Sequence, residues 1–243
     1  MGLQTVLQAV FPPECLQCGA RVEDAFAICG ACWAETPFIL GSACDICGTG
    51  LPGQTSDRPG EVLICDECTQ TPRPWDRGRA VMGYSNIGRS MVLAMKHGDR
   101  ADIARAAGPW LARAAVDLID DDPLLVPIPL HWSRLAKRRF NQAALLAQSF
   151  ARHAGLDWDP MPLRRIRATP SQEGRDRDAR YRNVTDAIAA DPKRSVVLQG
   201  RRIILIDDVM TSGATFAAAT EACYAAGAEK VSVLALARVG MDT

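Results

Sequence analysis

One stretch of this chain, residues 203–215 with the sequence IILIDDVMTSGAT, restricts the fold more than any other feature. Four of its first five residues are Ile or Leu, which is typical of a strand buried on both faces. The adjacent acids Asp207 and Asp208 come next. After them the chain has a run of small and hydroxyl residues, namely Thr211, Ser212, Gly213, Ala214 and Thr215. The pattern predicts a buried parallel strand, a polar loop at its carboxyl end and a helix after the loop.

The loop after this strand has the composition of a phosphate-binding site. In open α/β sheets, ligands bind beyond the carboxyl ends of the strands. Gly213 lets the backbone approach an anion closely, its neighbours offer N–H groups and hydroxyls, and the next helix adds its N-terminal dipole. The two acids suit a sugar, because vicinal hydroxyls donate to carboxylates and Mg²⁺ binds carboxylate, hydroxyl and pyrophosphate oxygens. The stretch therefore predicts a ribose 5-phosphate ligand that carries a diphosphate.

The last two thirds of the chain alternate strand and helix patterns. Strands are expected at 79–85, 124–130, 202–207 and 230–239. Helices are expected at 87–98, 102–120 (interrupted at Gly108-Pro109), 141–155 and 215–228. This alternation predicts a parallel α/β sheet with helices on both faces. A Walker A pattern is absent from the sequence, which argues against a P-loop nucleotidase.

Eight of the nine cysteines lie before residue 70 and form four Cys-x-x-Cys pairs. The pairs are Cys15/Cys18, Cys29/Cys32, Cys44/Cys47 and Cys65/Cys68. Zinc takes four thiolates in a tetrahedron, and two intervening residues let one tight turn offer both sulfurs to one ion. Pairing neighbours leaves loops of 10 and 17 residues, whereas an interleaved pairing needs longer loops, whose closure costs entropy. We therefore favour two consecutive ribbons with two structural zinc ions over the interleaved alternative.

Charge separates this cysteine-rich segment from the rest of the chain. Residues 1–75 carry three basic groups against nine acidic ones, and the remainder carries 25 against 19, a net +6. An anion-binding surface therefore belongs to the later part, and the zinc ions are expected to be structural, because four-thiolate sites are closed. Contact of a ribbon with nucleic acid or a protein partner is the alternative. Cys223, on the predicted helix 215–228, is expected to be a core thiol.

Three features bear on domain boundaries and location. The segment 71–78, TPRPWDRG, has the composition of a linker, so we predict a double zinc ribbon at 1–72 and an α/β domain at 73–243. No apolar run approaches the roughly 18 residues of a membrane span, and residues 1–15 lack the basic region of a signal peptide. Paired cysteines in a reducing compartment hold metal more often than they form disulfides. These features predict a cytoplasmic protein.

The stretch 203–215 closely resembles the PRPP-binding (phosphoribosyl pyrophosphate) fingerprint of type I phosphoribosyltransferases: an apolar strand, two acids, then Thr-Ser/Thr-Gly-x-Thr. Together with 126–147, 93–100, the region from Gln172 to Asn183 and the double zinc ribbon, it resembles the ComF family over nearly the whole chain. The resemblance implies a phosphoribosyltransferase-like domain, PRPP bound with Mg²⁺, and a link to DNA uptake in competent bacteria. One departure is Arg139, which stands where the family often has Gly and implies a changed local loop geometry.

Basic residues in the later part are candidates for binding pyrophosphate or nucleic acid. The predicted loop after 124–130 contributes Arg134, Lys137, Arg138 and Arg139, and the resemblance places Lys96 near the same anion. The segment 164–182 has seven arginines against three acids, a net +4, and includes Arg175, Arg177 and Arg180. It is placed like the flexible loop that closes over PRPP in phosphoribosyltransferases. Mobile arginines also suit a nucleic-acid backbone, or simply a solvated surface.

Two hypotheses follow for the function. In the first, Asp207, Asp208 and the 211–215 loop hold Mg²⁺–PRPP while a nucleophile displaces pyrophosphate at ribose C1, with the protein supplying positioning and charge stabilisation. This would make the chain a transferase, with the two acids as its catalytic residues and an unidentified acceptor. In the second, a non-catalytic protein keeps the fold and senses PRPP or handles single-stranded DNA, with DNA-uptake proteins as partners. The fold alone does not decide between them.

Overall fold

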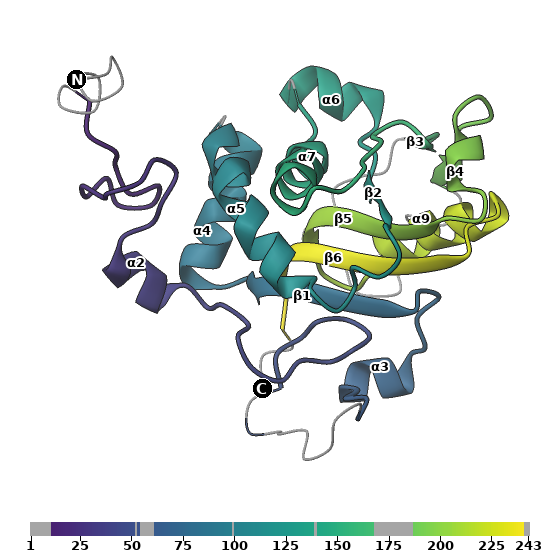
Figure 1. The fold of residues 1–243 in the computed structure, drawn as a ribbon, viewed down its shortest axis with the longest axis horizontal. Helices are drawn as coiled ribbons and strands as arrows, with labels where there is room; N and C mark the ends of the chain where they lie inside the picture. The colour runs from purple at the N-terminus through teal and green to yellow at the C-terminus, as the bar shows by residue number, and fades with distance from the viewer. Residues whose placement is uncertain are drawn as a thin grey trace.

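The computed structural model describes residues 11–51, 53, 61–98, 100–138, 140–167 and 187–240. Its centre is a four-stranded parallel sheet in the order β1-β6-β5-β2 (Figure 1). The strands are β1 (Arg77–Gly83), β2 (Leu124–Pro127), β5 (Arg202–Met210) and β6 (Lys230–Arg238). The alternation of strands and helices in the sequence therefore predicted the sheet correctly, because parallel strands need a crossover between them.

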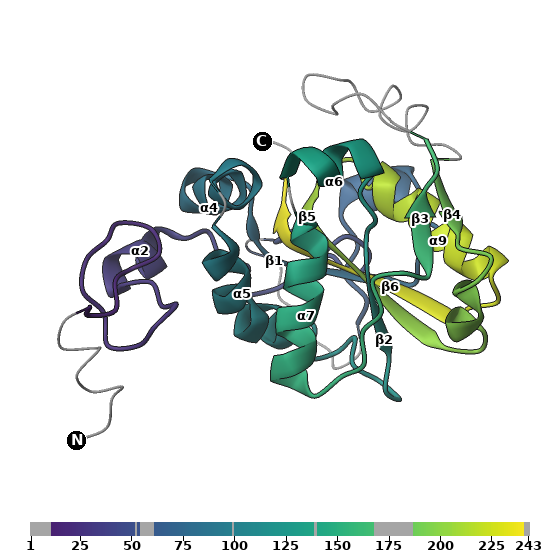
Figure 2. The ribbon, with the colours of Figure 1, turned by 90° about the horizontal axis from the view of Figure 1, so that it is seen from above.

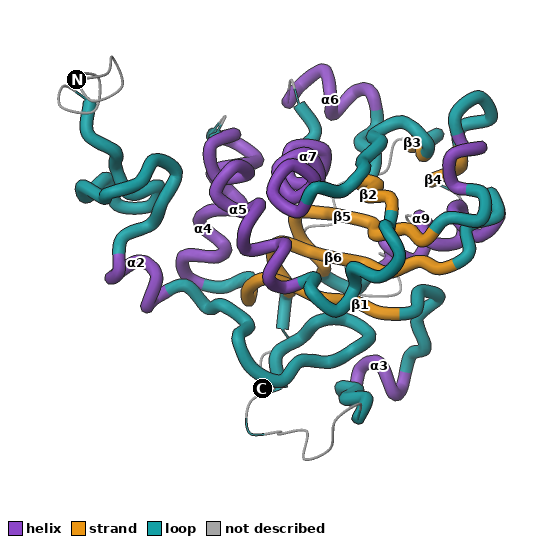
Figure 3. The backbone as a smooth tube through the Cα atoms, in the orientation of Figure 1, coloured by secondary structure: helices purple, strands orange, loops and turns teal. Residues whose placement is uncertain are grey.

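Three helices cover one face of the sheet: α4 (Asn86–His97), α5 (Ala101–Ala114) and α7 (Gln142–Ala154). Figure 3 shows these helices above the strands. Side chains of β5 and β6 such as Ile204, Ile206 and Leu234 are buried here against apolar helix residues that include Leu146 and Phe150. Alternate strand residues share one face, so this face takes Ile204 and Ile206 of β5.

The opposite face takes Ile203 and Leu205 of β5 and is covered in a different way. Helix α9 (Ala214–Ala225) lies on it, together with the antiparallel pair β3 (Leu163–Arg165) and β4 (Ile188–Ala190). The same buried cluster contains Cys44, Cys47 and Cys68. The second cysteine cluster and the sheet therefore share one apolar core. The boundary between residues 72 and 73 stays a prediction.

The described part of the cysteine-rich segment contains two short helices, α2 (Gly30–Glu35) and α3 (Asp66–Gln70). Cys15 and Cys32 of the first cluster are buried against Met91 of α4 and Ile103 of α5. Figure 2 shows α2, which contains Cys32, beside α4 and at the end of the molecule opposite β3 and β4. A 3-10 helix, η1 (Ser195–Leu198), precedes β5.

Helix α5 differs from expectation, because it continues through Gly108-Pro109 where the sequence predicted an interruption. Pro109 has no N–H for the carbonyl of Arg105, which would be its partner in a regular helix. Ser149 Oγ of α7 donates to that oxygen instead, at 3.1 Å. Gly108 makes the approach possible, since a Cβ atom there would lie 2.5 Å from Ser149 Oγ. A neighbouring helix thus satisfies the carbonyl that proline leaves unpaired.

Candidate functional site

The loop predicted to bind phosphate connects β5 to α9, and one glycine decides its conformation. Gly213 has φ 80°, in the left-handed region that favours glycine, and the helix begins at the next residue. A Cβ atom at Gly213 would lie 2.8 Å from Cη2 of Trp75, so packing also excludes a larger residue. The chain therefore turns sharply from the end of the sheet into a helix N-terminus, where backbone N–H groups and the helix dipole favour anions.

The hydroxyl residues of this loop differ in exposure. Thr211 and Thr215 are half-buried and reach the surface, whereas Ser212, Gly213 and Ala214 are buried. Ser212 Oγ lies 3.4 Å from Ala214 N, so its hydroxyl faces the first turn of α9. The two threonines are thus the accessible hydroxyl donors among the five predicted loop residues.

The two acids lie at the carboxyl end of β5, beside the centre of the sheet. Asp208 is 8% exposed and Asp207 is half-buried, and Asp207 Oδ1 accepts a hydrogen bond of 2.9 Å from Asp208 N. Burial and the negative charge of Asp208 raise the pKa of Asp207 to about 7, partly offset by Lys96 and Arg165. A cation at this point would relieve the repulsion, and two carboxylates offer the hard oxygen ligands that Mg²⁺ prefers.

Lys96 lies close to one of the two acids. Its Nζ lies 3.3 Å from Asp208 Oδ2, and its side chain is 21% exposed. The residue belongs to the last turn of α4, which Gln142 of α7 contacts through a bond of 3.4 Å from Nε2 to the carbonyl of Met95. Residues more than 100 positions apart in the sequence therefore meet at the end of β5.

The other predicted cations cannot be placed in the same way. Residues 132–138, predicted as a loop, form the short helix α6 (Trp132–Arg138), whose backbone carries Arg134 and Arg138. Asn141 follows it, donating from Nδ2 to the carbonyl of Ile128 and accepting from Ala143 N at the start of α7, so both ends of this connection are held. Four further candidate cations lie outside the described residues: Arg139, Arg175, Arg177 and Arg180.

Three charged residues contact the loop or support it without having been predicted from the sequence. Arg73 donates from Nη1 to the carbonyl of Ser212 at 2.6 Å, and Arg238 donates from Nη1 to the carbonyl of Thr211 at 2.7 Å. Glu67 pairs with both arginines. The one available signal was the position of Arg238 after eight mostly apolar residues, at the end of a strand parallel to β5. Neither Arg73 nor Glu67 belongs to a recognisable motif.

The cysteines form the two clusters that consecutive pairing predicts. Within each cluster, the four sulfur atoms all lie within 4.8 Å of one another. The first cluster consists of Cys15, Cys18, Cys29 and Cys32, and the second of Cys44, Cys47, Cys65 and Cys68. Four sulfurs at about 2.3 Å from a zinc ion lie about 3.8 Å apart. The observed separations of 3.7 Å between sulfurs of Cys18 and Cys29, and of Cys47 and Cys65, fit that geometry. Both sites are consistent with structural zinc.

Cys223 has the role expected for it. It is fully buried in α9, and burial raises the pKa of its thiol to about 12. The side chain is therefore a protonated member of the core.

Comparison with known proteins gives a consistent result. Residues 6–69 match the family model described as "Double zinc ribbon domain". The "DNA utilization protein YhgH" of Escherichia coli (strain K12) is 31% identical over 230 residues, covering 86% of this chain and 97% of that protein. "Competence protein F" of Haemophilus influenzae is 24% identical over 236 residues, covering 93% of this chain and 96% of that protein. The chain belongs to the ComF family.

Parts of three stretches that carried the ComF resemblance, 93–100, 126–147 and 203–215, come together in three dimensions, whereas the region from Gln172 to Asn183 lies outside the described residues. Lys96 in 93–100 contacts Asp208 in 203–215, and the start of 126–147 lies in β2, which pairs with β5. Pro127 is in register with Ile206, so the ComF segment after β2 leaves the sheet next to the two acids. These stretches therefore border one site, although they are far apart in the sequence.

Solved structures that match this chain at low similarity include a phosphoribosyltransferase. A hypoxanthine phosphoribosyltransferase from Staphylococcus aureus is 15% identical with a TM-score of 0.33, covering 60% of this chain and 68% of that one. The observed parallel sheet flanked by helices, preceded by the double zinc ribbon, agrees with the fold class expected for a ComF protein. None of the described helices is both long and apolar enough to cross a membrane.

Proposed function

We propose that this ComF protein binds PRPP with Mg²⁺ at the carboxyl end of β5 and transfers its ribosyl group at C1, with release of pyrophosphate. The observation that carries the proposal is the position of Asp207 and Asp208 in the last four residues of β5, which is followed by a loop whose glycine, Gly213, turns the chain into the N-terminus of α9. The family fingerprint and the geometry of the turn agree in their ligand chemistry. A sugar phosphate satisfies both the anion-binding turn and the two acids.

The backbone of the loop supports binding of the 5-phosphate. The carbonyls of Thr211 and Ser212 are held by Arg238 and Arg73. Because the C=O and N–H groups of a trans peptide point in opposite directions, the N–H groups of Ser212 and Gly213 are turned away from those arginines. Together with the hydroxyls of Thr211 and Thr215 and the N-terminus of α9, they would form the donors of a phosphate site.

The acids supply the other half of the site. Asp208 pairs with Lys96 of α4, and the charges that act on Asp207 include Lys96 and Arg165 of β3. When bound there, Mg²⁺ would neutralise charge on the pyrophosphate leaving group. The carboxylates would accept hydrogen bonds from the ribose hydroxyls, and Lys96 would face the developing negative charge. The role of the protein in the transfer is then positioning and charge stabilisation.

A calorimetric titration with Mg²⁺–PRPP tests the proposal. Wild-type protein is compared with the Asp207→Ala/Asp208→Ala double variant and with a matched control, Asp121→Ala/Asp122→Ala. The control also removes two adjacent acids, but these are exposed and lie before the start of β2, at the other end of the sheet. Binding by the wild type and the control, and its loss in the first variant, would support the site. Absence of wild-type binding would contradict the proposal.

Transfer is tested separately from binding. Pyrophosphate release from PRPP is followed while purine and pyrimidine bases, ammonia and other amines are offered in turn as nucleophiles. Release that depends on one acceptor, and that disappears in the Asp207→Ala/Asp208→Ala variant, would identify the reaction. Tight PRPP binding without release for any acceptor would favour a PRPP sensor over a transferase.

Handling of single-stranded DNA is the second candidate function, and the names of the relatives favour it: one is a DNA utilization protein and another a competence protein. The arginine-rich segment 164–182 would contact the phosphates, with the competence machinery as partner. Binding of an oligonucleotide should then weaken steeply with salt, and neutralising Arg175, Arg177 and Arg180 together should reduce the slope. An unchanged salt slope in the triple variant would remove this segment from the DNA site. We also propose a cytoplasmic location, because eight thiols that hold metal must stay reduced.

A further inference from the structure

A buried ionic cluster connects the second zinc site to the phosphate loop. Glu67 lies between Asp66 and the zinc ligand Cys68, in α3, and its side chain is 11% exposed. One carboxylate oxygen, Oε1, is 2.6 Å from Arg73 Nη2, and the other, Oε2, is 2.7 Å from Arg238 Nη2. The two arginine side chains are only 1% and 4% exposed. The carboxylate of Glu67 therefore pairs with two buried guanidinium groups.

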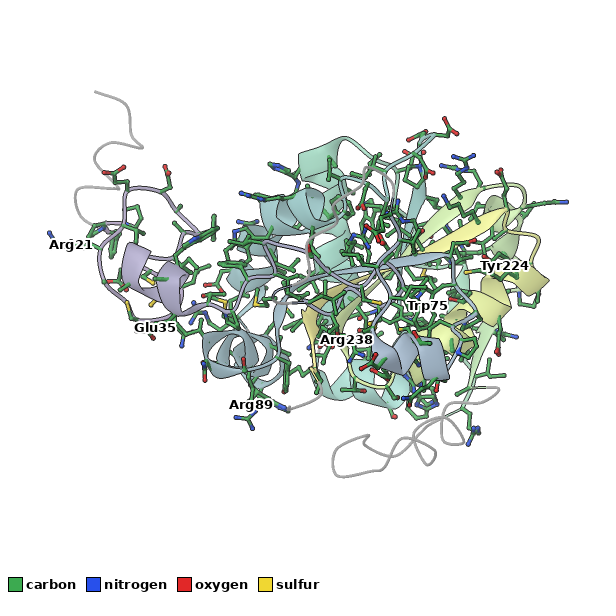
Figure 4. The ribbon with its side chains drawn as sticks, turned by 90° about the horizontal axis from the view of Figure 1, so that it is seen from below. Arg21, Glu35, Trp75, Arg89, Tyr224 and Arg238 are labelled. Atoms are coloured by element: carbon green, nitrogen blue, oxygen red, sulfur yellow. The ribbon has the colours of Figure 1, made fainter. Side chains whose placement is uncertain are left out.

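The same two arginines hold the loop by its backbone. Arg73 donates to the carbonyl of Ser212 at 2.6 Å, and Arg238 donates to the carbonyl of Thr211 at 2.7 Å. Arg238 ends β6, next to Met210 at the end of β5, and Figure 4 shows it on the side of the sheet where Trp75 lies. Each guanidinium thus joins the carboxylate of a zinc-binding turn to a peptide group of the loop.

Trp75 forms a second connection between the ribbon and the loop. Its indole Nε1 donates to the carbonyl of Ile46, which lies between the zinc ligands Cys44 and Cys47, at 2.6 Å. Cη2, at the other end of the indole, is the atom that a Cβ atom at Gly213 would contact. Both turns of the second zinc site therefore reach the loop, one through Glu67 and one through Trp75.

The first zinc site lacks the corresponding acid. The turns Cys29–Cys32 and Cys65–Cys68 have the same spacing, and each begins a short helix. Ala31 occupies the position that Glu67 has in the second turn, and Ala31 is exposed. The first ribbon packs against α4 and α5 and shares the buried cluster of Met91 and Ile103. The two ribbons are thus similar in metal binding and different in what they contact.

We propose that the second zinc ribbon positions the phosphate loop, with Glu67 acting through Arg73 and Arg238. The two arginines orient the peptide groups of Thr211 and Ser212 so that the following N–H groups face the ligand. Loss of the carboxylate leaves two buried cations without their shared counter-charge, and the loop relaxes as they rearrange. Zinc in the second site then controls ligand binding, while zinc in the first does not. This inference rests on the proposed PRPP site.

The test compares three variants of the full chain. Glu67→Gln removes the charge, Glu67→Asp keeps it on a shorter side chain, and Asp66→Asn is the control, because Asp66 is an exposed acid of the same turn. Zinc content, Mg²⁺–PRPP affinity and amide hydrogen exchange of residues 209–217 are measured for each. We expect Glu67→Gln to bind two zinc ions, to lose about tenfold in affinity and to exchange faster in this segment. Glu67→Asp should recover part of both effects, and Asp66→Asn should behave as wild type.

The outcomes separate this inference from the proposed function. If the wild type binds PRPP and Glu67→Gln changes neither affinity nor exchange in 209–217, the positioning role is wrong and the ligand site stands. If the wild type binds no PRPP while Glu67→Gln still accelerates exchange only in this segment, the proposed ligand is wrong and the connection stands. Faster exchange throughout the chain, with loss of zinc, would show that Glu67 merely supports folding and would overturn the inference.

Discussion

Lys96 Nζ lies 3.3 Å from Asp208 Oδ2, joining the last turn of α4 to the carboxyl end of β5. The pair is partly shielded, with side chains 21% and 11% exposed. Helix α4 and strand β5 therefore contribute to one charge arrangement, in which a lysine faces an acid that has a second acid beside it. This arrangement leads to the first two expectations below.

Replacing Lys96 by Met should weaken binding of Mg²⁺–PRPP by about tenfold, since a charge-assisted contact to an anion is lost. Lys193→Met serves as the control, because Lys193 is an exposed lysine outside the site. Calorimetry at two salt concentrations checks the effect. Equal affinities for the Lys96 variant and the wild type would place the lysine outside the ligand site.

Stability should depend on pH through Asp207. Burial and the charge of Asp208 raise its pKa from the ordinary 3.8 to about 7. A raised carboxyl pKa means that the folded state holds the proton more tightly than the unfolded chain. The stabilising contribution of Asp207 is complete below about pH 4 and is lost as the pH rises through 7. In the absence of Mg²⁺, Asp207→Asn should therefore raise the free energy of unfolding at pH 8 by on the order of 2 kcal/mol and have little effect at pH 4.

Unfolding in denaturant at pH 4 and pH 8, without Mg²⁺, checks this expectation. The difference in free energy between Asp207→Asn and the wild type should grow with pH. Mg²⁺ should reduce the difference at pH 8, because the metal compensates the two carboxylates of the wild type. Parallel pH profiles for the two proteins would mean that Asp207 titrates normally.

Gly213→Ala should lower the free energy of unfolding and weaken PRPP binding. The substitution places a side chain in the left-handed region and brings its Cβ to 2.8 Å from Trp75. Gly200→Ala is a matched control, because Gly200 has φ 67° and nothing within 4 Å of an added Cβ. The conformational cost of about 1 kcal/mol is common to both, so the difference between them, about 1–3 kcal/mol, measures the clash.

A variant of Trp75 tests how much the indole ring contributes to the cost of Gly213→Ala. Trp75→Phe removes the part of the indole that faces Gly213, so the Gly213→Ala change should cost less in that background. Equal costs in the two backgrounds would show that Trp75 moves aside without resistance. A double-mutant cycle from denaturant unfolding gives the comparison.

Cys29→Ser and Cys65→Ser should have unequal consequences. Both cysteines are half-buried, and each precedes a short helix of its zinc site, so the chemical change is the same. The second site belongs to the core of the sheet, whereas the first packs on α4 and α5. Cys65→Ser should lower the unfolding free energy by roughly 3 kcal/mol or more and weaken PRPP binding, because zinc binding is coupled to folding. Cys29→Ser should largely preserve PRPP binding.

A zinc assay should find one ion per chain in each variant. The prediction is that Cys65→Ser loses more stability and more PRPP affinity than Cys29→Ser. Denaturant unfolding and calorimetry on the same preparations measure the two losses. Equal losses of affinity would mean that the two ribbons support the ligand site equally.

Much of this molecule follows from local patterns. The alternation of strands and helices and the pairing of cysteines in consecutive ribbons were predicted from sequence and are confirmed. The strand predicted at 202–207 is also present, but it continues through the two acids to Met210. Each depends on residues close together in the chain, where hydrophobic periodicity, turn residues and ligand spacing act directly. The interruption predicted at Gly108-Pro109 of α5 was wrong, because a hydroxyl from another helix donates a hydrogen bond to the carbonyl of Arg105.

The sequence by itself determined the two zinc sites, the parallel sheet and the acidic end of β5. Only the tertiary structure decided which charges meet there: Lys96 with Asp208, and Glu67 with two arginines separated by 165 positions, Arg73 and Arg238. The reason is physical. Covalent spacing and periodicity restrict neighbours along the chain, whereas pairing of buried charges depends on which distant segments the packed core brings within hydrogen-bonding distance.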